Sequence, residues 1–130
     1  MRYLSTEPLK LRKPMPAPDH AHANGGGEPP NLSLPRLLLM LLTAYQPSQR
    51  FHLDDNQLRS RNKAMDVLEG DPDDGFYLLD DREVELCKLI LSKVAPFVMV
   101  THSENVPYVQ DALAEAPEKK PAPAAMPVQA

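Results

Sequence analysis

The feature that most constrains this chain is an unbroken run of leucine and methionine, Leu37–Leu42, within the segment Ser33–Tyr45. Both residue types are strong helix formers, and no β-branched residue interrupts the run. Ser33 can cap a helix by accepting a hydrogen bond from a free N–H group, and Pro35 falls in the first turn, where its missing N–H is not needed. Because Pro47 ends the pattern, the sequence predicts a helix over Ser33–Tyr45 that is apolar all round.

A helix that is apolar on every side must be covered on every side. The run is shorter than the roughly 20 residues that cross a bilayer, so we expect no membrane span. We therefore interpret it as the central helix of a small bundle. The alternative is that one face of the helix docks on a partner, which makes Leu37, Leu38 and Leu41 candidate partner-binding residues.

Capping signals predict two further helices. Asp54 or Asp55 can cap a helix, with Gln57 placed to reciprocate, and Asp80 has Glu83 at the same spacing. These pairs indicate a capping box, in which the first side chain and the third helical residue satisfy each other's N–H groups. Apolar residues recur at helical spacing after each pair. The predicted helices are 54–69 and 80–95.

The ends of the remaining elements are less sharply marked. Gly70 is expected to stop the second helix in the left-handed conformation. Ser103 or Asn105 is expected to begin a fourth helix over 105–116, with Pro107 in its first turn. An isolated pair of four-residue strands would be marginal, so we interpret 76–79 as a short extended piece and 97–100 as a buried connector.

These elements predict an all-α fold, a small three- to four-helix bundle with an extended Pro-rich N-terminal arm and a C-terminal tail. Fifteen prolines are present among 130 residues, and they gather toward the two ends. We accordingly divide the chain into a flexible Pro/Gly-rich arm over 1–31, a helical domain over 32–116 and a Pro/Ala-rich tail over 117–130. The helices are expected to form without the arm.

Charge and cysteine content narrow the classes of function. A net charge of −4 argues against a general nucleic-acid binder. A single cysteine excludes an internal disulfide framework and fits a reducing compartment. The first 31 residues lack the apolar stretch of a signal peptide. We therefore expect a cytoplasmic protein, or one within a virion if it is viral, and not a secreted one.

No motif points to a metal, a cofactor or catalysis. His20 and His22 would supply two of the about four ligands that a structural metal site needs, and the turn 71–75 lacks the spacing of a calcium-binding EF-hand loop. Cys87 lies on the apolar stripe of a predicted helix and is interpreted as a buried, inert thiol. His102, Ser103 and Glu104 are adjacent in sequence, which does not orient a catalytic triad. We expect no cofactor and no enzyme.

Two short basic clusters are the remaining candidate partner-binding residues: Lys10, Arg12 and Lys13, and Arg59, Arg61 and Lys63. The simpler interpretation of the second cluster is a solvated face of mixed charge, because aspartate and glutamate flank it. The alternative is a weak electrostatic handle for phosphates.

The leading hypothesis for function is a non-enzymatic protein–protein interaction or assembly subunit, in its narrower form a small structural or accessory component of a phage or other viral particle. Its partner would be another protein, a larger assembly or a second copy of the chain. The alternative is a small regulatory or adaptor protein that binds nucleic acid, or an enzyme acting on it, through the modest basic clusters.

Overall fold

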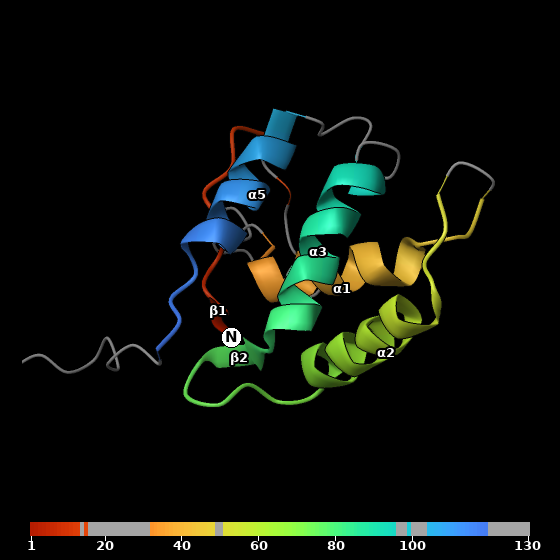
Figure 1. Ribbon diagram of the computed structural model, residues 1–130. Coiled ribbons are helices and arrows are strands. Elements are labelled where there is room, and N and C mark those ends of the chain that lie inside the picture. The colour runs from red at the N-terminus through yellow and green to blue at the C-terminus, as the bar shows by residue number, and fades with distance from the viewer. Residues whose placement is uncertain (14, 16–31, 49–50, 96–98, 100–103, 120–130) are drawn as a thin grey trace, which may run out of the picture.

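The computed structural model describes residues 1–13, 15, 32–48, 51–95, 99 and 104–119. Over these residues the chain is mostly helical, with four helices and one small sheet of two strands. The elements are β1 (Arg2–Ser5), α1 (Leu34–Ala44), α2 (Asp55–Glu69), β2 (Phe76–Leu79), α3 (Asp81–Lys93) and α5 (Val106–Glu115). Figure 1 shows α1 crossing the middle of the molecule, with the other helices and the sheet arranged around it. The expected helical fold class is confirmed in this coarse form, and the sheet is an addition.

The predicted caps start the first three helices. Ser33 Oγ accepts a hydrogen bond from the Arg36 N–H at the start of α1. Asp54 and Gln57 form both hydrogen bonds of a capping box at α2. Asp80 and Glu83 do the same at α3. These helix starts depend on contacts between residues three apart, which explains why local sequence predicts them.

The expected left-handed conformation of Gly70 is wrong. Its φ of −84° and ψ of −171° are extended, and its N–H donates to the Val67 carbonyl. The chain leaves α2 in an extended conformation, and the Tyr77 hydroxyl donates to the Gly70 carbonyl. Positive φ values occur later, at Asp74 (53°) and Gly75 (83°), in the turn that leads into β2.

The core is built around α1. Four of its leucines, Leu37, Leu38, Leu41 and Leu42, are 0% exposed, and α2, α3, α5 and β1 all contact the helix. This confirms the interpretation of α1 as the central helix. The expectation that the helix is covered on every side is wrong, because Arg36, Met40 and Thr43 are exposed on one side of it. The alternative, a face open to a partner, is wrong for Leu37, Leu38 and Leu41, because the same chain already covers their side chains.

Residues 1–13 are part of the fold. For these residues the expectation of a flexible arm over 1–31 is corrected. β1 pairs antiparallel with β2 in a register that sets Arg2 opposite Leu79 and Ser5 opposite Phe76. The Leu4 side chain is 0% exposed. The physical reason is that β1 supplies the ladder partner that β2 lacks locally, and Leu4 buries an apolar side chain in doing so. The rest of the expected arm, 14 and 16–31, lies outside the described residues apart from Met15.

Two other expectations fall mostly outside the described part of the chain. Of the expected buried connector at 97–100 only Met99 is described; it is 2% exposed, and its N–H donates to the Ala95 carbonyl. Of the expected tail over 117–130, residues 117–119 are described. The Pro117 carbonyl accepts a hydrogen bond of 2.9 Å from the Tyr3 N–H, so the start of the tail contacts β1.

We predict that Leu4→Ala lowers the free energy of unfolding by about 2–4 kcal/mol, because it leaves a cavity where a fully buried leucine packs. Urea denaturation followed by circular dichroism measures the change. Leu78→Ala is the matched control, since Leu78 lies in the partner strand and is 37% exposed. Equal losses in the two variants would contradict a core position for Leu4.

We also predict a pH-dependent effect of Glu83→Gln. Burial raises the pKa of Glu83, and the nearby charge of Asp80 adds to this. The folded state therefore binds the proton of the Glu83 carboxyl group more tightly than the unfolded state does. The protonated carboxyl group contributes to stability at acidic pH, and this contribution is lost as pH rises through the raised pKa. Glutamine keeps the Oε1 acceptor for the Asp80 N–H, so the variant should unfold at higher urea than the wild type at pH 7 and at the same urea at pH 4.

Glu85→Gln is the control for this experiment, because Glu85 lies two residues further along α3 with its side chain 73% exposed. It should show no such difference between the two pH values. A Glu83→Gln variant that is destabilised at pH 7 would show that the charge, and not only the acceptor, is needed in the capping box.

Candidate functional site

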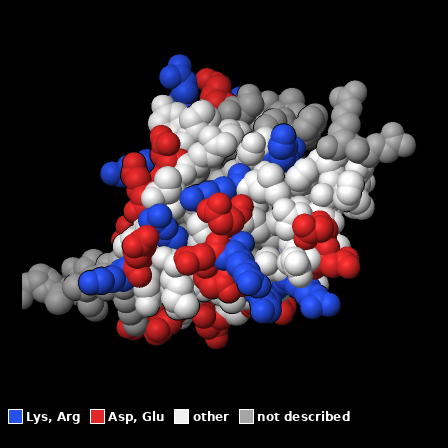
Figure 2. Space-filling view, in the orientation of Figure 1, with Lys and Arg blue, Asp and Glu red and all other residues white. Residues whose placement is uncertain are grey.

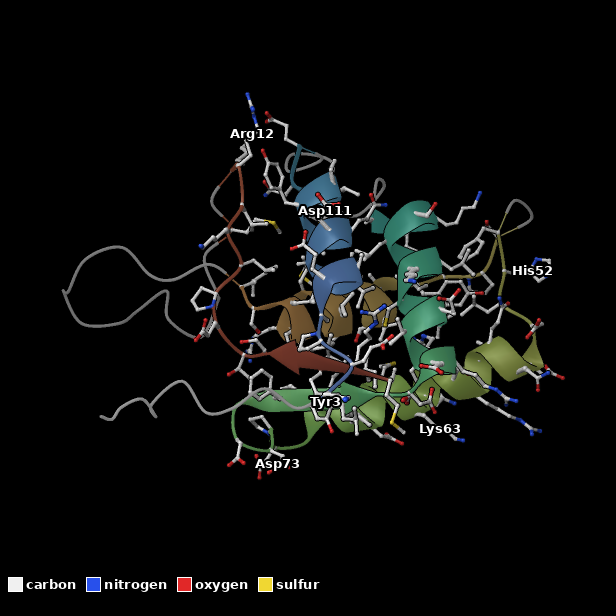
Figure 3. All side chains as sticks on the ribbon, turned by 60° about the vertical axis from the view of Figure 1, so that its left-hand side comes forward. Tyr3, Arg12, His52, Lys63, Asp73 and Asp111 are labelled. Atoms are coloured by element: carbon white, nitrogen blue, oxygen red, sulfur yellow. The ribbon has the colours of Figure 1, made fainter. Side chains whose placement is uncertain are left out.

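The predicted basic residues do not form one surface. Lys10, Arg12 and Lys13 are exposed in the segment after β1, whereas Arg59 and Lys63 are exposed on α2. Figure 3 places Arg12 and Lys63 at opposite ends of the molecule. Figure 2 shows basic and acidic side chains interspersed over the face it presents. The structure therefore supports two separate groups of cations rather than a phosphate-binding face.

Arg61 has a structural role. Its Nε donates to the Leu42 carbonyl at 2.8 Å, which satisfies a carbonyl in the last turn of α1 that has no partner within the helix. The guanidinium also lies over the Tyr45 ring, 5.7 Å from its centroid. The Tyr45 hydroxyl in turn accepts from the Leu53 N–H. Arg61 thus ties α2 to the end of α1 and is not available as a free cation.

Arg12 is also engaged. Its Nε donates to Glu104 Oε2 at 3.0 Å. The hydrogen bond to Glu104, and then the neighbouring Tyr108, raise the pKa of Arg12 above its usual value. Both side chains of the ion pair are more than half exposed. The pair fastens the segment after β1 near the start of α5.

Asn105 makes the strongest connection at this end. Its side chain is 0% exposed. Its Oδ1 accepts from the Lys13 N–H at 2.8 Å, and its Nδ2 donates to the Lys13 carbonyl at 2.7 Å. Asn105 precedes α5 as expected but makes no capping hydrogen bond with its side chain. The expectation that it caps the helix is corrected, because its amide pairs with a backbone 92 residues away in sequence.

The other end of the N-terminal segment is held at the end of α5. Arg2 Nη1 donates to the carbonyls of Ala116, at 2.6 Å, and Ala114, at 3.2 Å. Residues 2–13, which we call the N-terminal strap, are therefore fastened to both ends of α5.

Between its two attachments the strap leaves a groove of about 490 Å³ against α5. The strap forms one wall and α5 the other. The lining residues are Tyr3, Leu4, Ser5, Glu7, Pro8, Leu9, Lys10, Leu34, Tyr108, Asp111, Ala112, Glu115, Ala116 and Pro117. We call this the strap groove. Its volume lies in the range of about 300–1,000 Å³ that is typical of ligand sites.

The α5 wall is one face of an amphipathic helix. Tyr108, Asp111, Ala112 and Glu115 are spaced three and four residues apart and share this face. The opposite face buries Val109 and Leu113 in the core. The wall consequently offers one aromatic ring, 44% exposed at Tyr108, one small residue and two carboxylates. Figure 3 shows Asp111 on α5, across from the part of the strap that leads to Arg12.

The strap wall is the free edge of a strand. The Tyr3 N–H points away from β2, because it donates to Pro117. In an antiparallel ladder the N–H and C=O of one residue point to the same side of the strand. The N–H and C=O of the residue two positions further on point to that side as well. The Ser5 N–H and C=O therefore also point away from β2. Within the described part of the chain, neither group has a hydrogen-bond partner.

The groove is acidic. Glu7, Asp111 and Glu115 bring three exposed carboxylates to its lining, and Lys10 brings one ammonium group. None of the three carboxylates forms an ion pair within the described residues. A cationic ligand would therefore find unpaired negative charge on both walls.

Other chemistry has little support in the described residues. No three His, Cys, Asp or Glu side chains among them gather to hold a metal ion. Burial and the charge of Glu83 raise the pKa of Cys87 to about 12, and its thiol is 0% exposed, so it stays protonated and out of reach. His20, His22 and His102 lie outside the described residues. No described helix has both the length and the apolar character to span a bilayer.

Comparisons of the chain with protein-family models, with curated proteins and with solved structures found no match. The function of this chain is therefore inferred from the geometry of its own surface.

Sequence reasoning missed the strap groove and most of its residues. Of the candidate residues named from sequence, only Lys10 lines it. A signal was present in α5, where Tyr108, Asp111 and Glu115 share a helical face that the apolar stripe does not use. The opposite wall had no local signal, because the edge of β1 exists only once β1 pairs with residues far along the chain.

We predict that Asn105→Ala lowers the free energy of unfolding by about 2–4 kcal/mol, because it leaves the backbone groups of Lys13 without their buried amide partner. Native-state hydrogen exchange should show the Lys13 amide exchanging markedly faster. Glu104→Ala, which removes only the exposed ion pair with Arg12, is the control and should cost less than about 1 kcal/mol. A Lys13 amide that exchanges at the same rate in Asn105→Ala would contradict the connection.

Proposed function

We propose that the protein is a non-enzymatic protein-interaction subunit and that the strap groove is its binding surface. The observation that carries this proposal is the open edge of β1 beside an exposed face of α5. Unpaired backbone N–H and C=O groups at a strand edge are a template for another chain. An aromatic residue with one end exposed, such as Tyr108, is typical of the residues that anchor protein interfaces.

Two further observations support an interaction role over catalysis. The described groove residues that carry acid–base groups are carboxylates, one lysine and two tyrosines on an open surface, and the only thiol is buried and protonated. The strap also consists of an edge strand and extended chain held by hydrogen bonds to α5, an arrangement that presents backbone rather than a catalytic pocket.

The alternative of an adaptor for nucleic acid has less support. Of its six basic candidates, Arg61 is tied to Leu42 and Arg12 to Glu104. Lys10 lines an acidic groove. The narrower form of the leading hypothesis, a component of a phage or viral particle, stays a prediction.

The proposal predicts that a photo-crosslinking residue at Tyr108 captures a partner protein in cells of the source organism and that Ala112→Trp abolishes the capture. A tryptophan at this small residue fills the middle of the α5 wall. We expect the crosslinked product to fall by about tenfold or more, which corresponds to about 1.4 kcal/mol of binding free energy. Mass spectrometry of the crosslinked band identifies and quantifies the partner.

Gln110→Trp is the matched control. Gln110 is exposed on α5 but does not line the groove, so the same substitution on the same helix should leave the crosslink unchanged. Circular dichroism and urea denaturation establish that both variants are folded. A crosslink that survives Ala112→Trp, or that falls equally in both variants, would show that the groove is not the binding surface.

A further inference from the structure

We infer that the strap groove takes an extended segment of a partner protein, rich in lysine and arginine, which adds as a strand to the outer edge of β1. This inference rests on the proposed function and specifies the chemistry of the partner. It follows from the direction of the backbone groups in β1, from the way the two sheet edges differ, and from the charge of the groove.

Within the described part of the chain, the outer edge of β1 carries unpaired backbone groups. Tyr3 N–H is occupied by Pro117, but the Tyr3 C=O and the Ser5 N–H and C=O point to the same side and are unpaired among the described residues. Further along the strap, the Glu7 N–H is satisfied by Ser5 Oγ at 3.1 Å. Strand addition therefore has a defined site of a few hydrogen bonds centred on Ser5. Peptide recognition by strand addition works in this way, with the main chain giving affinity and side-chain sites giving specificity.

The two edges of the sheet differ in their surroundings. On β2 the Phe76 N–H and C=O, which point away from β1, are both bonded to Asp73. That edge is closed at its start by its own turn, and it does not border the strap groove. The edge of β1 faces a hollow that has room for an incoming chain. An extended segment that enters there lies between the Ser5 backbone and the face of α5 that carries Tyr108 and Glu115.

The charge of the lining indicates the chemistry of the partner. Asp111 and Glu115 lie four residues apart on α5, and Glu7 lines the groove from the strap. In an extended segment successive side chains alternate in direction, so every second one can point to the same wall. Basic residues at alternate positions would meet these carboxylates. Lys10 is the only basic residue among the described lining residues, and it forms no ion pair with Glu7, Asp111 or Glu115.

The experiment selects ligands from a library of random decapeptides displayed on phage, with the full chain immobilised at low salt. We expect the selected peptides to be enriched in lysine and arginine at alternate positions. A synthetic copy of the most enriched peptide is then titrated by fluorescence anisotropy. Enrichment of acidic or wholly apolar peptides, or the absence of any selected peptide, overturns the inference.

Two matched variants test the site of binding. Asp111→Lys with Glu115→Lys reverses both carboxylates of the α5 wall and should weaken binding about tenfold. Asp66→Lys with Glu69→Lys makes the same change in net charge on exposed residues of α2 and should weaken it less than about threefold. Equal losses in the two double variants would mean that the peptide responds to net charge alone, which overturns the groove as its site.

Backbone methylation tests strand addition itself. Each amide of the peptide is methylated in turn, which removes one donor at a time. If the peptide pairs with β1, methylation at alternate positions across the central residues should weaken binding about tenfold, while the positions between them tolerate it, because alternate N–H groups of a strand point to opposite sides. A flat or helical pattern of sensitivity overturns strand addition.

Failure of this inference is distinguishable from failure of the proposed function. If Ala112→Trp abolishes the cellular crosslink but no basic peptide binds, the groove is an interaction surface for another kind of partner. If the crosslink survives Ala112→Trp, the proposed function itself is wrong, whatever the peptides do.

Discussion

The structure depends on one constraint, which is that α1 must bury a wide face of leucines, while Arg36, Met40 and Thr43 lie exposed on its other side. Its four fully buried leucines contribute about 1.5–3 kcal/mol each on burial. Together this amounts to about 6–12 kcal/mol, comparable to the whole net stability of a small domain. The chain must therefore cover this leucine face, and the remaining elements are arranged as its covers. α2, α3 and α5 pack on it from different sides, and β1 closes a further part of its surface with Leu4.

This constraint explains why the N-terminal residues belong to the fold. The strap lies against the residues that lead into α1, where the Leu9 N–H donates to the Leu32 carbonyl and Pro8 forms a bridge with Ser33. Its position is fixed by hydrogen bonds between residues that are close in space but far apart in sequence. Arg2 binds the last carbonyls of α5, and Asn105 binds the Lys13 backbone just before the helix begins. Because both attachments are made to one short helix, the strap and α5 form a single unit with a fixed separation.

The sequence predicted what depends on neighbouring residues. Ser33, Asp54 and Asp80 begin helices through hydrogen bonds to residues three positions further on, so their role can be inferred from spacing alone. β1 could not be predicted in this way. Arg2–Ser5 is too short and too mixed to indicate a strand, and its partner lies more than seventy residues further along the chain. The role of Asn105 could not be predicted from local sequence either. An asparagine before a helix is suited both to capping the helix and to pairing with a distant backbone, and only the tertiary structure shows that its amide binds Lys13.

The groove follows from the same arrangement, and its open edge needs a physical explanation, since unpaired strand edges invite aggregation. Most proteins cover such an edge or interrupt it with charge. Here the edge of β1 is short, and Arg2 and Glu7 lie at its two ends. α5 stands beside it, with the strap groove between them. If an extended segment adds to β1 as proposed, it would lie between Ser5 and the face of α5. On this proposal the groove would favour the addition of one strand over edge-to-edge stacking of sheets, because α5 limits the space beside the edge.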